Sequence, residues 1–126
     1  MSASDPATSR RVPKPWGYEL IWAHTDRYVG KILHIEKGHA LSYQYHRQKE
    51  ETIHLLHGSL QLEVAEAERP RRVLVLAAGD SFHVPPGLRH RMVALETCDV
   101  LEASTPELDD VVRLEDRYGR AGTSEP

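Results

Sequence analysis

The segment GHALSYQYHRQKEETIHLLHG, residues 38–58, decides both the fold and the chemistry of this chain. Side chains two residues apart on a β-strand point to the same face, so Gln44 and His46 project together. Glu51 begins the next apolar run, from which its carboxylate can face that pair across a sheet. The segment therefore brings one amide, one imidazole and one carboxylate to neighbouring positions.

A second segment, GDSFHVPPGLRH at residues 79–90, ends in His90 after a turn rich in proline and glycine. It would deliver one more imidazole to the first group. Two nitrogen and two oxygen donors suit zinc or another first-row divalent ion. Gln44 either completes the ligand set or orients a metal-bound water. The remaining histidines are expected to be structural or solvated: His24, His34, His39, His54, His57 and His83.

Around these segments the chain consists of short runs rich in Val, Ile, Leu, Thr and Tyr, separated by glycine, proline and charged residues. The predicted strands are 18–24, 28–35, 40–46, 51–57, 59–65, 72–76, 81–84, 89–95 and 98–103. Strands at such short, regular spacing are typical of an all-β sandwich or barrel and not of βαβ units. His57-Gly58-Ser59 is predicted to be a tight hairpin. Residues 106–118 are expected to form a short helix or an ordered tail.

Length and composition indicate a single soluble domain. The chain has 126 residues, a formal net charge of −3 and one cysteine, Cys98, so it has no internal disulfide. Basic residues are mixed with acidic ones, which argues against a nucleic-acid partner. No apolar run is long enough to cross a membrane, and the start of the chain lacks the apolar core of a secretory signal, so a cytoplasmic location is expected. Residues 1–13 and 121–126 are expected to be flexible, flanking one domain at 14–120.

The two segments resemble the two motifs of the cupin superfamily. The first motif has glycine, five residues, His-x-His, four residues, Glu, six residues and glycine, and residues 38–58 keep every spacing with Gln44 in place of the first histidine. The second has glycine, five residues, Pro-x-Gly, two residues and histidine, which residues 79–90 match. The resemblance implies a jelly-roll β-barrel, or double-stranded β-helix, that associates as a homodimer. It places the metal ligands at Gln44, His46, Glu51 and His90.

A narrower resemblance is to the type II mannose-6-phosphate isomerase cupin domain, often fused behind a mannose-1-phosphate guanylyltransferase. It rests on KPWGYE at 14–19, QYH at 44–46 and DDVVRLEDRYGR at 109–120. The chain departs from this family beside the metal ligands, with RQK at 47–49 and TI at 52–53 where His-His-Arg and His-Trp are usual. These departures leave open a different metalloenzyme, such as a dioxygenase or lyase, and a non-catalytic sugar-binding protein.

The resemblance implies an aldose–ketose isomerase acting on a phosphosugar. A divalent ion, zinc first and otherwise iron, manganese, cobalt or nickel, would stabilise charge on oxygen while a base moves a proton between C1 and C2. Glu51 is the carboxylate nearest this role, with Glu50 second, and Lys49 and Arg120 complete the predicted catalytic group. A phosphosugar also needs cationic partners. The candidates are Lys31, Lys49, Arg89, Arg91 and Arg120.

Overall fold

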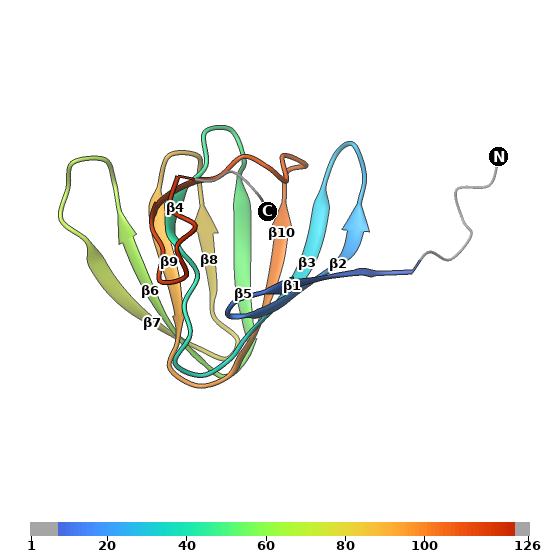
Figure 1. The fold of residues 1–126 in the computed structure, drawn as a ribbon, viewed down its shortest axis with the longest axis horizontal. Coiled ribbons are helices and arrows are strands. Elements are labelled where there is room, and N and C mark those ends of the chain that lie inside the picture. The colour runs from blue at the N-terminus through green and yellow to red at the C-terminus, as the bar shows by residue number, and fades with distance from the viewer. Residues whose placement is uncertain (1–7, 123–126) are drawn as a thin grey trace.

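The computed structural model describes residues 8–122, which form eleven β-strands and no helix (Figure 1). The strands are β1 Arg10–Lys14, β2 Gly17–His24, β3 Val29–Ile35, β4 Tyr43–Tyr45, β5 Glu51–His57, β6 Ser59–Ala65, β7 Arg72–Ala77, β8 Ser81–Val84, β9 Arg89–Ala94, β10 Cys98–Ser104 and β11 Val112–Glu115. All nine predicted strands are present within two residues of their expected starts, except the run 40–46, of which only residues 43–45 are strand. Among the described residues, no helix is long and apolar enough to span a membrane.

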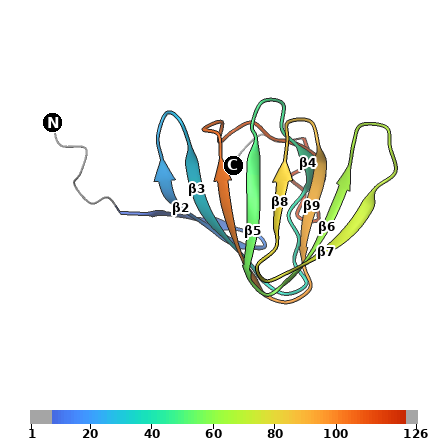
Figure 2. The same ribbon diagram turned by 180° about the vertical axis from the view of Figure 1, so that it is seen from behind.

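Two antiparallel sheets face each other. One has six strands in the order β1-β2-β3-β10-β5-β8, and the other has five in the order β11-β4-β9-β6-β7. Figure 2 shows the sheets side by side, with the β6–β7 hairpin at one edge and the β2–β3 hairpin at the other. Strands far apart in sequence are neighbours, as β10 is with β3 and β5. The predicted all-β cupin jelly roll is confirmed.

Gly58 is a corner between the sheets, and the predicted hairpin at His57-Gly58-Ser59 is wrong. The strand before it, β5, pairs with β10 and β8, whereas the strand after it, β6, pairs with β7 and β9. Gly58 has φ 100°, and a Cβ there would lie 2.4 Å from the carbonyl oxygen of Thr97. Only glycine permits this close crossing, which moves the chain from one sheet to the other.

The two ends of the domain are ordered further than the sequence indicates. Residues 10–14 form β1, paired with β2, so strand structure begins inside the segment expected to be flexible. The helix considered for residues 106–118 is wrong, because Val112–Glu115 is a strand paired with β4. Val111 and Arg113 are both buried, which is the two-residue alternation of a strand. Residues 1–7 and 123–126 of the predicted flexible ends lie outside the described residues.

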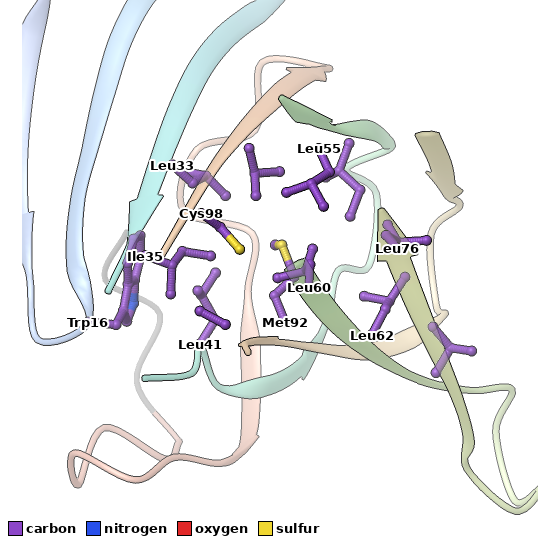
Figure 3. Close-up of a cluster of buried hydrophobic side chains, with 14 residues drawn as sticks. Trp16, Leu33, Ile35, Leu41, Leu55, Leu60, Leu62, Leu76, Met92 and Cys98 are labelled. Atoms are coloured by element: carbon purple, nitrogen blue, oxygen red, sulfur yellow. The ribbon is translucent and has the colours of Figure 1, made fainter. Parts of the chain in front are cut away.

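The hydrophobic core fills the space between the sheets (Figure 3). Inward-facing positions alternate along each strand, as Leu33 and Ile35 do on β3 and Leu60 and Leu62 do on β6. Four residues at one side of this region line a polar pocket as well: Trp16, Leu33, Leu41 and Met92. The apolar core therefore forms a rigid wall for the pocket, which opens toward the C-terminal segment.

Candidate metal centre

Three predicted ligands come together, and two of them, His46 and Glu51, line the pocket. His46 follows the end of β4, Glu51 is the first residue of β5, and His90 lies in β9. One potential ligand atom from each lies within 4.8 Å of the others, and all three side chains are buried. Metal–ligand bonds to nitrogen and oxygen are about 2 Å long, so a single ion could contact all three. The jelly roll thus assembles the cluster from both sheets.

Hydrogen bonds fix the orientation of both imidazoles. His46 donates from Nδ1 to the carbonyl oxygen of Asp110 at 2.6 Å, and His90 donates from Nδ1 to that of Leu88 at 2.9 Å. A carbonyl only accepts, so a neutral ring carries its proton on Nδ1 and turns an Nε2 lone pair toward Glu51. Glu51 Oε1 lies 3.2 Å from Nε2 of His46 and 3.4 Å from Nε2 of His90.

This arrangement fits a cation. Two nitrogen lone pairs and a carboxylate oxygen at such distances repel one another unless a positive charge lies among them. Nε2 of His90 is fully buried and makes no hydrogen bond of good geometry within the described residues. A divalent ion would satisfy all three donors, and their chemistry, two imidazoles and a carboxylate, is that of common zinc and transition-metal sites.

Gln44, the fourth predicted ligand, lies beside the cluster. Its Cα pairs with that of His90 across β4 and β9, and its side chain lines the same pocket. Its Oε1 accepts a hydrogen bond from the Ser42 hydroxyl at 3.1 Å, which holds the amide in place. Both sequence-based roles, ligand or support for a metal-bound water, remain predictions.

Glu51 belongs to a buried network of charges. Lys49 lies between two carboxylates, with Nζ 3.5 Å from Glu51 Oε2 and 3.1 Å from Glu102 Oε2. Burial alone would raise the pKa of Glu51, but the adjacent Lys49 ammonium outweighs burial, and the pKa lies well below its usual value. Burial and the neighbouring Glu51 raise the pKa of Glu102. Burial alone would lower the pKa of Lys49. The attraction of the Glu102 and Glu51 carboxylates is stronger, so the pKa of Lys49 is raised overall.

The rest of the pocket is rich in cations. Lys31 donates to Glu19 at 3.0 Å, and Lys14 lies 4.0 Å from the same carboxylate. Arg120 is held by Asp116 through its Nε at 3.1 Å and its Nη2 at 3.0 Å. The cavity has a volume of about 50 Å³ and is lined by Lys14, Trp16, Glu19, Lys31, Leu33, Leu41, Ser42, Gln44, His46, Lys49, Glu51, Met92, Glu102, Leu108, Val111, Arg113 and Arg120.

Several predicted site residues lie elsewhere. Glu50 points away from the pocket, where its carboxylate is 2.5 Å from His83 Nε2 on the surface, so it cannot serve as the base. Arg91 pairs with Glu63 outside the pocket, and the Arg89 guanidinium lies 5.7 Å from the centre of the Tyr45 ring. Neither arginine lines the cavity. Lys31, Lys49 and Arg120 do line it.

Sequence reasoning missed four charged residues of the pocket: Lys14, Glu19, Glu102 and Arg113. A signal for two of them was present. Along β10, Glu102 falls in phase with the buried residues Cys98 and Val100, and along β2, Glu19 falls in phase with Ile21. An ionisable side chain at an inward-facing position of a barrel strand indicates a functional interior.

The fold and the cluster define a class: a two-sheet β-barrel with a buried His-Glu-His group between its sheets. The chain belongs to the cupin family, because residues 31–103 match the model of the cupin domain. That span contains β3 to β10 except the first two residues of β3 and the last residue of β10, and with it the whole candidate metal cluster.

Among curated proteins, the chain resembles the xanthan biosynthesis protein XanB of Xanthomonas campestris, with 33% identity over 123 residues. It also resembles the mannose-1-phosphate guanylyltransferase ManC of Salmonella typhimurium, with 33% identity over 117 residues. These alignments cover 93% and 88% of this chain but only 25% and 23% of those proteins. The chain therefore spans about a quarter of the length of these relatives.

Solved structures support the fold. Oxalate decarboxylase from Bacillus subtilis superposes with a TM-score of 0.75 at 16% identity, covering 84% of this chain and 30% of that one. KdgF from a Halomonas species superposes with a TM-score of 0.64 at 24% identity, covering 79% of this chain and 88% of that one. At such identities the likeness concerns the barrel alone.

Proposed function

We propose that this chain is a metal-dependent aldose–ketose isomerase that acts on a phosphosugar of the mannose 6-phosphate type. One observation carries the proposal: the pocket lined by His46 and Glu51 of the His-Glu-His cluster is also lined by five basic side chains, Lys14, Lys31, Lys49, Arg113 and Arg120. The cluster suits a divalent ion, and the basic residues suit a phosphate group. The resemblance to mannose-1-phosphate guanylyltransferases points to the same class of substrate.

His46, Glu51 and His90 would hold the ion, with Gln44 beside them, and we propose zinc as the first candidate. A bound divalent ion would supply Lewis acidity to the substrate's carbonyl and hydroxyl oxygens. Each histidine is held by a backbone carbonyl, so the two Nε2 atoms stay aimed at one point without reorganisation. Preorganised ligands of this kind keep the site ready for substrate.

We propose that Glu102 moves the proton between C1 and C2, in place of Glu51. Glu51 would be engaged by the metal and is therefore the weaker base. Glu102 lines the pocket without belonging to the His-Glu-His cluster, and Lys49 bridges it to Glu51. Both remaining carboxylates pair with a lysine, Glu19 with Lys31 at 3.0 Å and Glu102 with Lys49 at 3.1 Å, but Lys49 also contacts Glu51, so Glu102 lies beside the candidate metal site. Glu102 is accordingly the carboxylate best placed to accept and return a proton.

The C-terminal segment lines this site, and we propose that it moves when substrate enters. A cavity of about 50 Å³ holds about four water molecules, whereas a phosphosugar is much larger. The segment lines the pocket through Leu108, Val111, Arg113 and Arg120, and Figure 1 shows it (orange to red) crossing from β10 to β4. We propose that residues 105–122 open to admit substrate and close to exclude water.

The direct test is to incubate the metal-loaded chain with mannose 6-phosphate and measure fructose 6-phosphate. The proposal predicts steady turnover that is lost with a chelator and restored by a divalent ion. Absence of product with every metal tried, from protein that contains stoichiometric metal, would contradict the isomerase assignment. Unphosphorylated mannose is the matched control substrate and should turn over far more slowly.

A further inference from the structure

Four of the basic pocket residues form a group of their own, which we call the cationic cluster: Lys14, Lys31, Arg113 and Arg120. They come from β1, β3, β11 and the turn after β11. Two carboxylates accompany them, Glu19 beside the lysines and Asp116 beside Arg120. Four cationic side chains thus line one part of the pocket, and such a group suits the doubly charged phosphate monoester present near neutral pH.

We propose that the cationic cluster is a subsite for the phosphate group of the substrate, separate from the metal ligands. This proposal rests on the proposed function and specifies which end of the substrate binds where. The lysines act as point charges, and each arginine offers a planar fork of donors that matches phosphate oxygens.

Strand register sets the distance between the two subsites. Arg113 pairs with Gln44 across β11 and β4, and Gln44 pairs with His90 across β4 and β9. Arg113 and His90 are thus two strand spacings apart, about 10 Å between backbones. That separation suits a sugar whose phosphate is on the terminal carbon, far from the carbonyl that reacts at the metal.

Lys14 experiences the positive charge of the cluster directly. Its side chain is only 5% exposed. Burial, followed by Lys31, Arg113 and Arg120, lowers the pKa of Lys14, and Glu19 opposes this shift only in part. A dianion bound beside Lys14 would relieve the repulsion and would therefore be stabilised at this position.

The test titrates inorganic phosphate into the 126-residue chain and into its variants Lys14→Met, Lys14→Arg and the control Lys37→Met. Lys37 is an exposed lysine with a surface ion pair to Glu96. Lys14→Met should fold, because it removes a repelled charge and leaves the Lys31–Glu19 pair intact; circular dichroism and thermal unfolding verify this. A chelator is present throughout, so phosphate bound to a metal ion does not contribute.

The proposal predicts that Lys14→Met weakens phosphate binding by about 10- to 100-fold, the usual worth of a hydrogen bond to a charged group. Lys14→Arg should retain most of the affinity, and Lys37→Met all of it. Phosphate binding that is unchanged in Lys14→Met, or absent from the wild-type chain, would overturn the subsite.

The outcome is separable from that of the isomerase assay. If phosphate binding depends on Lys14 but the chain has no isomerase activity, the subsite is supported and the proposed isomerase reaction is contradicted. If isomerase activity is found, Lys14→Met should raise KM for mannose 6-phosphate by a similar factor and leave KM for mannose unchanged. An unchanged KM for mannose 6-phosphate would overturn the subsite while leaving the isomerase intact.

Discussion

The metal cluster and the cationic cluster lie in one pocket but have opposite electrostatic character. Around the histidines, Glu51 and Glu102 face a single lysine, Lys49, so one negative charge is in excess. Around Lys14, three further cations line the pocket, Lys31, Arg113 and Arg120, and each of them lowers the pKa of Lys14. The first environment favours a divalent cation and the second a dianion. This difference within a few strands indicates a pocket built for a ligand that needs a metal at one end and carries phosphate at the other.

Replacing Glu102 with Gln should give the largest effect, because it removes the proposed proton carrier. We expect kcat for mannose 6-phosphate to fall by about 10²- to 10⁴-fold while metal content and KM stay near wild type. Steady-state kinetics and elemental analysis of the same preparation provide the measurement. Glu96→Gln, at an exposed position, is the control. Turnover close to wild type in Glu102→Gln would show that Glu102 takes no part in proton transfer.

Asp110 connects the metal side of the pocket to the C-terminal segment, and its loss should weaken metal binding. Its carboxylate accepts hydrogen bonds from the backbone N–H groups of Arg47, Gln48 and Lys49, and its carbonyl accepts from His46. Asp110→Ala should lower metal affinity by about 10- to 100-fold, as the loss of groups that orient ligands does elsewhere. Competition with a chromogenic chelator measures this.

The neighbouring Asp109 supplies the control for that experiment. Asp109 is exposed, and Asp109→Ala should leave metal affinity unchanged. Equal affinities in the two variants would mean that the loop carrying His46 holds its shape without Asp110.

Acid should destabilise the cationic side of the pocket through Asp116. Burial would raise the pKa of Asp116, but hydrogen bonds from Arg120 and nearby backbone outweigh it and lower the pKa below 3.8. A carboxyl with a depressed pKa contributes stability above its ordinary pKa and loses it as pH falls through the folded-state value. Urea unfolding should therefore show stability falling below about pH 4. Asp116→Asn should cost about 1.5–3 kcal/mol at neutral pH and flatten this decline.

His34, on the opposite surface of β3 from Lys31, should give the smallest effect. Its hydrogen bond to Asp99 raises the pKa of His34 above 6.5. Burial opposes this shift, and a second hydrogen bond, to Glu36, adds to it. A raised pKa contributes stability below the ordinary value and loses it as pH rises through the folded-state value. NMR titration of His34 should show the raised midpoint, and Asp99→Asn should lower it. A midpoint that Asp99→Asn leaves unmoved would exclude the pairing.

The metal cluster could be predicted from sequence because its ligands fall in two short segments with fixed spacing. The three ligands lie on or next to strands within the segments 38–58 and 79–90, whose spacing is visible in the sequence. The all-β pattern of the remaining chain is consistent with the barrel that brings these segments together. The corner at Gly58 was mistaken for a hairpin, because a glycine between two apolar runs does not reveal whether those runs pair or separate into different sheets.

The cationic cluster could not be assembled from sequence in the same way. Lys14, Lys31 and Arg113 are far apart along the chain and meet only through the order and register of β1, β3 and β11. Arg89 and Arg91 looked equally suitable by position, and the structure places them outside the pocket. Long-range register decides which basic residues face inward, and local patterns carry little information about it.

The most direct test of the metal site is the metal content of the 126-residue chain purified without added metal. The account predicts about one divalent ion per chain in the wild type and almost none in His46→Ala or His90→Ala, both verified to be folded. Full metal occupancy in either variant, or a wild-type chain that binds no divalent ion at all, would contradict the assignment of His46, Glu51 and His90 as the metal site.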